Sequence, residues 1–202
     1  MARARSRPLG PPPDDPGDLP DLPSVELADV PLWRIHRSST DPLALASDPF
    51  GRFNLARPRG TVYAAEEQLG AFVEVFGRLA IIDATDLRAY RLSELRAPGA
   101  RVADLTRRGV LGRVGLTAEI HTTTDYELTR AWAAAVASQG LDGIRYRARH
   151  DPAAKLTSLA LFGRRGKLKA DVVETSRIPT ELVREAELQF ELIAAPRRLP
   201  RR

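Results

Sequence analysis

Four side chains in the first third of the expected domain have types and positions that suit chemistry on a charged ligand. Arg34 lies inside the stretch PLWRIHR, which has the composition of a strand, and Arg52 lies in the loop sequence GRFN. Tyr63 is in a second short strand, and Glu74 lies eleven residues further on, in the helix expected after that strand. Folding alone requires no charge at Arg34 or Glu74, so we take these four residues as the candidate site.

The four residue types match the parts of a nicotinamide dinucleotide. An arginine offers a planar fork of donors, so Arg34 and Arg52 suit a dianionic pyrophosphate, and Tyr63 offers a stacking face and a hydroxyl. A carboxylate such as Glu74, placed next to a ribose, stabilises the oxocarbenium-like transition state in which an N-glycosidic bond breaks. The alternative interpretation is structural, with surface ion pairs for the arginines, a core position for Tyr63 and a solvated helix face for Glu74.

Two strands and one helix are expected to position these side chains. Strands are predicted at 31–37 and 61–65, the first with Arg34 on one face of its alternating pattern. In the helix expected over 66–79, a stripe at helical period is formed by Leu69, Phe72, Val73 and Phe76. Glu74 lies on a different face, together with the small residues Gly70 and Ala71, which permit close approach to a neighbouring element.

The rest of the chain alternates between strands and helices. A helix is expected from the cap at 122–125 to Ser138, ended by Gly140, and a short helix is expected from Pro179. Further strands are predicted at 86–95, 101–105, 143–147, 157–162, 171–175 and 188–193, of which 143–147 and 157–162 are expected to pair in the core. The predicted fold class is a small α/β (α+β) fold, with small mixed sheets and flanking helices.

The length of 202 residues fits one domain, which we place at residues 32–195. Residues 1–31 contain eight of the sixteen prolines, so neither helix nor strand is expected there, and we predict an extended or disordered leader. Within this leader, contacts to the domain or to a partner are offered by Leu19, Leu22, Val25 and Leu27. Residues 196–202 form a basic tail.

Composition excludes several classes of function. The absence of cysteine excludes disulfides, thiolate zinc sites and cysteine nucleophiles. The three histidines, His36, His121 and His150, have no metal-ligand spacing, so no metal site is expected. The longest apolar run, 131–137, is too short to span a bilayer, and the first residues lack the apolar segment of a signal peptide. We therefore expect a cytoplasmic protein without a membrane partner.

The formal net charge of +5 does not by itself indicate nucleic-acid binding. The 28 arginines, against three lysines, are scattered along the whole chain and form no dominant basic block. A basic nucleic-acid-binding module remains a third hypothesis, resting on Arg147, Arg149, Arg164, Arg165 and the tail. Because these residues lack the interleaved aromatic side chains on which bases stack, we predict no direct contact with nucleic acid.

Five stretches across residues 32–195 together form a family pattern. They are WRIHR (33–37), DPFGRFN (48–54), GTVYAAEEQLGAFVEVFGR (60–78), LDGIRYRARHDP (141–152) and LALF (159–162). Arg52 and Tyr63 are eleven residues apart, as are Tyr63 and Glu74. In this combination the sequence resembles the RES-domain family, bacterial toxins that consume NAD+.

The resemblance implies a fold similar to that of ADP-ribosylating toxins and an enzyme that cleaves the nicotinamide–ribose bond, as a glycohydrolase or a phosphorylase. It implies catalytic roles for Glu74, Arg34 and Tyr63 and an NAD+ pocket lined by Arg34, Arg52, Tyr63 and Glu74. Position 148, which holds Ala148 in this chain, is the fifth site position that the resemblance implies, for binding. NAD+ is then a substrate, and no permanently bound cofactor is expected. The expected partner is a protein antitoxin, a helical DNA-binding repressor that blocks the pocket; a homo-oligomer is also compatible with the sequence.

One position departs from the family pattern. The resemblance places a serine two residues after the tyrosine of the GIRYR segment, and this chain has Ala148 there. Three interpretations stay open: the chain is attenuated or inactive and binds only a nucleotide or a protein, the hydroxyl assists binding more than cleavage, or the alanine was introduced to tame a toxic product. Ser158 and Thr157, in the following strand, do not occupy the motif position.

Overall fold

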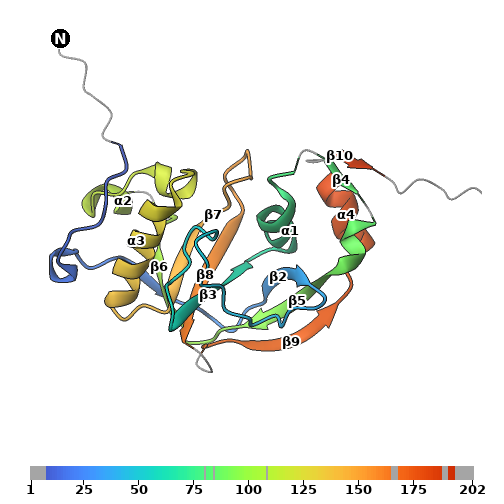
Figure 1. Cartoon of the computed structure of the whole chain (residues 1–202), viewed down its shortest axis with the longest axis horizontal. Coiled ribbons are helices and arrows are strands. Elements are labelled where there is room, and N and C mark those ends of the chain that lie inside the picture. The colour runs from blue at the N-terminus through green and yellow to red at the C-terminus, as the bar shows by residue number, and fades with distance from the viewer. Residues whose placement is uncertain are drawn as a thin grey trace, which may run out of the picture.

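An eight-stranded mixed sheet forms the centre of the protein (Figure 1). The structure, a computed structural model, describes residues 8–79, 81–83, 85–107, 109–164, 168–187 and 191–193. In spatial order the strands are β1 (Ser24–Glu26), β6 (Arg101–Asp104), β7 (Gly143–Arg147), β8 (Thr157–Arg164), β3 (Arg59–Ala65), β2 (Leu32–Arg37), β5 (Tyr90–Arg96) and β9 (Asp171–Ser176). A separate parallel pair is formed by β4 (Ile81–Asp83) and β10 (Glu191–Ile193).

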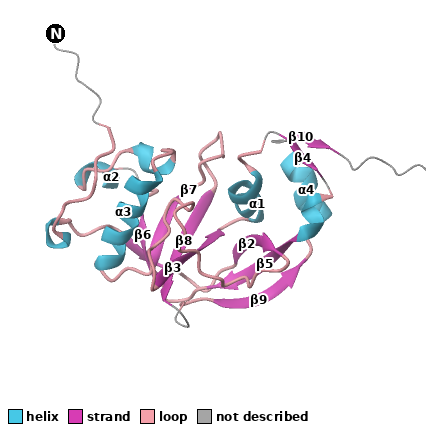
Figure 2. Cartoon of the chain, viewed as in Figure 1, coloured by secondary structure: helices cyan, strands magenta, loops and turns pink. Residues whose placement is uncertain are grey.

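Helices cover the two halves of this sheet separately (Figure 2). One half carries α2 (Val110–Arg113) and α3 (Tyr126–Ser138), with α3 against β7. The other half carries α1 (Gln68–Phe76), which packs on β2, β3 and β8, and α4 (Thr180–Glu187), which packs on α1. Short 3-10 turns lie at Pro16–Asp18, Asp86–Ala89 and Ala118–His121. The predicted mixed α/β (α+β) class is confirmed.

Local sequence signals explain the main helices. In α1 the predicted stripe of Leu69, Phe72, Val73 and Phe76 is buried. At the start of α3 the Asp125 carboxylate accepts a hydrogen bond of 2.9 Å from the Leu128 amide, and Gly140 takes a φ of +75° just after the helix end. These are the N-cap and the left-handed C-terminal residue that the sequence predicts.

The predicted pairing of 143–147 with 157–162 is confirmed, because β7 and β8 are antiparallel with Tyr146 opposite Ser158. One predicted strand starts too early: residues 86–89 form a 3-10 turn, and β5 begins at Tyr90. The cause is local, since the Asp83 side chain accepts hydrogen bonds from the backbone and hydroxyl of Thr85 and bends the chain there.

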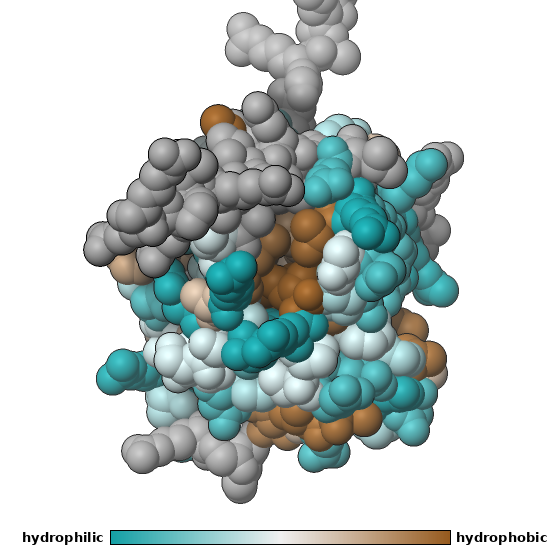
Figure 3. Space-filling view, turned by 90° about the vertical axis from the view of Figure 1, so that its right-hand side faces the viewer, coloured by the Kyte–Doolittle hydropathy of each residue, from teal (hydrophilic) through white to brown (hydrophobic). Residues whose placement is uncertain are grey.

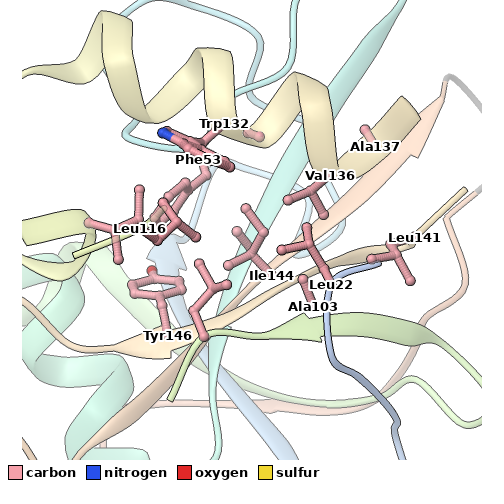
Figure 4. Close-up of a cluster of buried hydrophobic side chains, with 14 of the residues drawn as sticks. Leu22, Phe53, Ala103, Leu116, Trp132, Val136, Ala137, Leu141, Ile144 and Tyr146 are labelled. Carbon is pink, nitrogen blue, oxygen red and sulfur yellow. The ribbon is translucent and has the colours of Figure 1, made fainter. Parts of the chain in front are cut away.

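The prediction that the first 31 residues contain neither helix nor strand is wrong for the described part. Residues 24–26 form β1, an edge strand free of proline that pairs antiparallel with β6. Leu9, Leu19 and Leu22 are buried in the core under α3, where Leu22 lies beside Val136 and Leu141 (Figure 4). The prolines break the segment into short pieces but leave its leucines free to pack.

A few predicted features lie outside the described residues. One is the first half of the strand expected at 188–193: residues 188–190 lie outside the described residues, and residues 191–193 form β10. Another is the basic tail at 196–202.

At the α4 end of the molecule, hydrophilic side chains surround a hollow whose floor is hydrophobic (Figure 3). On β9, the edge strand next to β5, Val172 and Val173 are exposed.

Candidate active site

A cavity of about 350 Å³ lies where α1, the strands β2, β3 and β7, and the loop at 50–52 meet. Four of the five predicted site residues line it: Arg34, Arg52, Tyr63 and Glu74. The full lining is Trp33, Arg34, Ile35, Phe50, Gly51, Arg52, Tyr63, Ala64, Ala71, Glu74, Val75, Arg78, Tyr126, Tyr146, Arg149 and His150. Residues far apart in sequence therefore form one wall around a common space.

Arg34 is held between two strands of the sheet. Its Nη1 donates a hydrogen bond of 2.8 Å to the carbonyl oxygen of Tyr63, so the guanidinium reaches from β2 to β3. Its Nε is buried and has no hydrogen-bond partner in the described part of the chain. Burial lowers the pKa of Arg34 to about 10, and electrostatic interactions with Tyr63 and Asp41 offset only part of this effect. The side chain therefore stays cationic at neutral pH.

Arg52 is held by one hydrogen bond and by contacts with two aromatic rings. Its Nη2 donates a hydrogen bond of 2.6 Å to the Ile120 carbonyl, and its guanidinium lies 5.1 Å from the ring centre of Phe53 and 5.5 Å from that of Tyr146. Its Nε is also buried without a partner among the described residues. These contacts on two aromatic faces fix the plane of the guanidinium before any ligand arrives.

Tyr63 lines the cavity, and its hydroxyl holds the loop that carries Arg52. The hydroxyl accepts a hydrogen bond of 2.8 Å from the Phe53 amide and lies 3.0 Å from Oδ1 of Asn54, to which it donates. Glycine is required next to this contact, because a Cβ at Gly51 would lie 2.3 Å from the Asn54 side chain. Burial raises the pKa of Tyr63, so the hydroxyl keeps its proton. The hydroxyl is thus committed within the protein.

Glu74 projects from α1 on the face that approaches the sheet. A Cβ at Gly70, one turn earlier, would lie 2.9 Å from the Cβ of Ala65, so the small residues of this face do permit close approach. Burial raises the pKa of Glu74, while the Ser158 hydroxyl, the charge of Arg52 and the Tyr146 hydroxyl act in the opposite direction. A carboxylate in such surroundings interacts strongly with any charge that develops nearby.

Positive charge dominates the cavity. Its basic residues are Arg34, Arg52, Arg78, Arg149 and His150, and Glu74 is the only acid in its lining. Over the described residues, neither Arg34 nor Arg52 forms an ion pair within 4.0 Å. Burying a cation without a counterion costs stability, so structures retain such groups where a ligand supplies the anion. The charge of the lining is therefore suited to an anionic ligand.

Comparison with known proteins identifies the family. The sequence matches the RES domain over residues 31–184, which is most of the chain. The chain belongs to the RES domain family. Its fold is similar to a chain in the crystal structure of the M. tuberculosis MbcT–MbcA toxin–antitoxin complex, with a TM-score of 0.63 and 19% sequence identity over 80% of this chain and 90% of that chain. A search of curated proteins gave no match.

In this RES domain, Ala148 lies next to the cavity but not in its lining. It is 3% exposed and belongs to the hydrophobic cluster that also contains Ile35 and Ala71, which do line the cavity. Its amide donates a hydrogen bond of 3.0 Å to the Leu156 carbonyl. Tyr146, two residues earlier, is part of the cavity wall. The structure thus brings four of the five predicted residues together in the lining and leaves the fifth, Ala148, outside it.

Several residues of the wall were not predicted from the sequence. Phe50, Arg78, Tyr126, Arg149 and His150 come from a loop, from the region after α1, from the start of α3 and from the turn after β7. No spacing links them, because only the tertiary fold brings these segment ends together. Proximity to the predicted residues was the one usable signal, since Phe50 precedes Arg52 by two positions and Arg78 follows Glu74 by four.

The described residues contain no group of three or more histidine, cysteine, aspartate or glutamate side chains that could hold a metal ion. His36 is bonded to Ser93 and to the Arg37 carbonyl. Burial and the charge of Arg52 lower the pKa of His121 to about 4, so this histidine is neutral at physiological pH. In the same part of the chain, no helix is long and apolar enough to cross a membrane.

Proposed function

We propose that this RES domain binds NAD+ as a substrate and cleaves its nicotinamide–ribose bond, as a glycohydrolase or a phosphorylase. The observation that carries the proposal is the pair of guanidinium groups of Arg34 and Arg52, each with a buried Nε that has no hydrogen-bond partner among the described residues, in a cavity whose lining contains a single carboxylate, Glu74. Two forks of donors suit a pyrophosphate, and one carboxylate suits the ribose beside it. RES toxins are in general NAD+-degrading enzymes, which supports the assignment.

In the proposed reaction the bond between the ribose C1′ and the nicotinamide nitrogen breaks. Its electron pair stays with the nitrogen, so nicotinamide leaves as a neutral molecule and positive charge develops on the ribose. Glu74 stabilises that charge, and Arg34 and Arg52 hold the pyrophosphate so that the ribose stays beside the carboxylate. An oxygen of water or of inorganic phosphate then forms the new bond to C1′, and a water nucleophile loses a proton to solvent.

The direct test is to incubate the purified full chain with NAD+, with and without phosphate, and to measure nicotinamide release by chromatography. Glu74→Gln keeps the size of the side chain and removes its charge, so we expect turnover to fall by about 10²-fold or more. Glu67→Gln is the matched control, because Glu67 is an exposed acid just before the same helix and does not line the cavity. Equal rates in wild type and Glu74→Gln would remove Glu74 from the mechanism.

A second candidate function is nucleotide binding without catalysis, and Ala148 is the observation that favours it. If the missing hydroxyl is essential, calorimetry will show NAD+ binding while no nicotinamide appears over hours. In that case Ala148→Ser should restore release, since the rest of the cavity is present. Absence of both binding and release would reject the two candidates together.

We propose further that a protein antitoxin, a helical DNA-binding repressor, blocks this cavity. The similar fold is that of a chain from a toxin–antitoxin complex. In the present chain Phe50 is 82% exposed although it lines the cavity, and so offers an apolar contact to a covering protein. Co-expression with the adjacent reading frame, followed by pull-down, should yield a complex that no longer binds NAD+. A complex that binds NAD+ normally would contradict the blocking role.

A further inference from the structure

Ser158 is a buried serine with an unsatisfied hydroxyl. It lies on β8, directly opposite Tyr146 of β7 on one side and Ala65 of β3 on the other. Its exposed fraction is zero, and its Oγ makes no hydrogen bond of ordinary geometry with any residue that the structure describes. Leaving a buried polar group unpaired is costly, and an alanine would fill this position without that cost. The hydroxyl therefore needs a functional explanation.

The register of the sheet shows where this hydroxyl points. Residues directly opposite each other on neighbouring strands project to the same face, so Ser158, Tyr146 and Ala65 form one row across three strands. Helix α1 lies over this row, because a Cβ at Gly70 would be 2.9 Å from the Cβ of Ala65 and 3.8 Å from the Thr157 carbonyl oxygen. Glu74 follows Gly70 by one helical turn on the same face. The carboxylate thus lies above the row that contains Ser158.

A second observation agrees with this placement. Although burial raises the pKa of Glu74, the hydroxyls of Ser158 and Tyr146 and the charge of Arg52 favour its ionised form. Tyr146 and Arg52 line the cavity themselves, whereas Ser158 is not part of the lining. Its hydroxyl can therefore reach Glu74 and not the ligand.

We infer that Ser158 is a positioning residue, whose hydroxyl donates to the Glu74 carboxylate and holds it toward the ribose in a chain that has alanine at position 148. The inference rests on the proposed function, since the ribose is that of NAD+. Ser158 would thus supply a hydroxyl from β8, ten residues after position 148, where the family resemblance places a serine.

The test is Ser158→Ala in the full-length protein. Loss of a hydrogen bond to a charged group should lower kcat for nicotinamide release by about 10- to 100-fold. KM should change by less than about twofold, because Ser158 does not contact the ligand. The acid limb of the kcat–pH profile should move to higher pH, because a carboxylate that loses a donor has a higher pKa.

Other groups near Glu74 stay in place in this variant. Arg52, Tyr63 and Tyr146 interact electrostatically with the Glu74 carboxyl group. The remaining titratable side chains of the cavity are Arg34, Arg78, Tyr126, Arg149 and His150. Because none of them is altered, a shift of the acid limb between wild type and Ser158→Ala reports on the serine hydroxyl.

Ser93→Ala is the matched control. Ser93 is also completely buried in the sheet, but its hydroxyl bonds to His36 and Thr175, and it does not line the cavity. This control should lose stability and keep its kcat and its pH profile. In the Ser158→Ala background, Ala148→Ser should restore part of the rate if a hydroxyl at position 148 can replace that of Ser158.

A readout without substrate separates this inference from the proposed function. Carbon-13 NMR titration of the Glu74 carboxyl group should give a higher pKa in Ser158→Ala than in wild type, whether or not NAD+ is the substrate. An unchanged pKa overturns the inference, as does an unchanged kcat with an unmoved acid limb. The proposed function would still stand if Glu74→Gln lowers nicotinamide release in the same assay. Should Ser158→Ala not fold, Ser158→Cys, which keeps the shape with a weak donor, takes its place.

Discussion

Replacing Arg34 by methionine should make the protein at least as stable while abolishing tight NAD+ binding. The guanidinium is buried beside the cavity and makes no ion pair within 4.0 Å in the described part of the chain. Burial lowers its pKa from 12.5 to about 10, which corresponds to about 3 kcal/mol by which the fold disfavours the charged form. This penalty is present at every pH below about 10, and it fades as the pH rises toward 12.5.

One favourable contact opposes that penalty. The hydrogen bond of 2.8 Å from Nη1 to the Tyr63 carbonyl is lost in Arg34→Met, and a bond from a charged donor contributes about 1.5–3 kcal/mol. The two effects leave the variant between unchanged and about 1.5 kcal/mol more stable. For a chain of this size the melting temperature should then rise by up to about 5 °C. The affinity for NAD+ should fall by at least about 30-fold, because a buried charged contact to phosphate is removed.

Thermal unfolding at pH 7.5 and calorimetric titration with NAD+ measure both quantities. Arg37→Met is the control, because Arg37 is an exposed arginine of the same strand, lies 5.4 Å from the Tyr90 ring centre and does not line the cavity. It should bind NAD+ like wild type. If Arg34→Met loses more than about 2 kcal/mol of stability and keeps its NAD+ affinity, Arg34 is a structural brace and the reasoning from its unpaired charge is refuted.

Three further predictions follow from other contacts. Arg52→Lys keeps the charge but loses the fork and the stacking on Phe53, so NAD+ affinity should fall about tenfold by calorimetry, and stability by about 1 kcal/mol; wild-type affinity would contradict the pyrophosphate role. Leu22→Ala should cost about 2–5 kcal/mol in urea unfolding, because the side chain is buried, and a loss below about 1 kcal/mol would mean that the N-terminal segment does not support the core. Burial raises the pKa of Glu74, so the folded protein favours the protonated carboxyl group more than the unfolded chain does. The free energy of unfolding of wild type, compared with that of Glu74→Gln, should therefore fall as the pH rises from the ordinary carboxyl pKa to the raised one. Melting temperatures from about pH 4 to 8 test this, and parallel curves for the two proteins would refute it.

Sequence patterns predict those parts of the fold that depend on neighbouring residues. Periodicity predicts the stripe of α1, and capping residues predict both ends of α3. The order of the strands is a different kind of information: β9 pairs with β5, and the parallel pair of β6 and β7 requires a crossover through α2 and α3. Such pairings depend on contacts between distant segments, and a strand's own residues do not specify its neighbour.

The N-terminal segment shows the limit of reasoning from composition. Its prolines correctly predict that no long helix forms, but burial of Leu19 and Leu22 depends on a hydrophobic cluster with residues of α3 that exists only in the folded domain. The Trp132 indole and the Gln139 amide also hold the segment by donating hydrogen bonds to the carbonyls of Gly10 and Leu19. Nothing in residues 1–31 alone indicates these two partners.

The sequence predicts only those residues of the candidate site whose charge is unusual for their local position. Arg34, Arg52, Tyr63 and Glu74 lie on consecutive elements, and a charge within an apolar strand or on a helix face is visible in the sequence. Arg149 and His150 lie in a polar turn, where charged residues are ordinary, so only the fold shows that they face the cavity.

Arg145 and Arg34 differ in their ion pairs and in the direction of their pKa shifts. Arg145 on β7 is paired, with its Nε 2.6 Å from a Glu66 oxygen and its Nη1 3.2 Å from Asp104, and these partners raise its pKa. Arg34 has no such partner within 4.0 Å in the described chain, and burial lowers its pKa. Asp41 acts on Arg34 electrostatically but forms no ion pair with it within 4.0 Å, so among the described residues Arg34 lacks the direct carboxylate partners that Arg145 has. This contrast supports the proposal that an anionic group of a ligand pairs with Arg34.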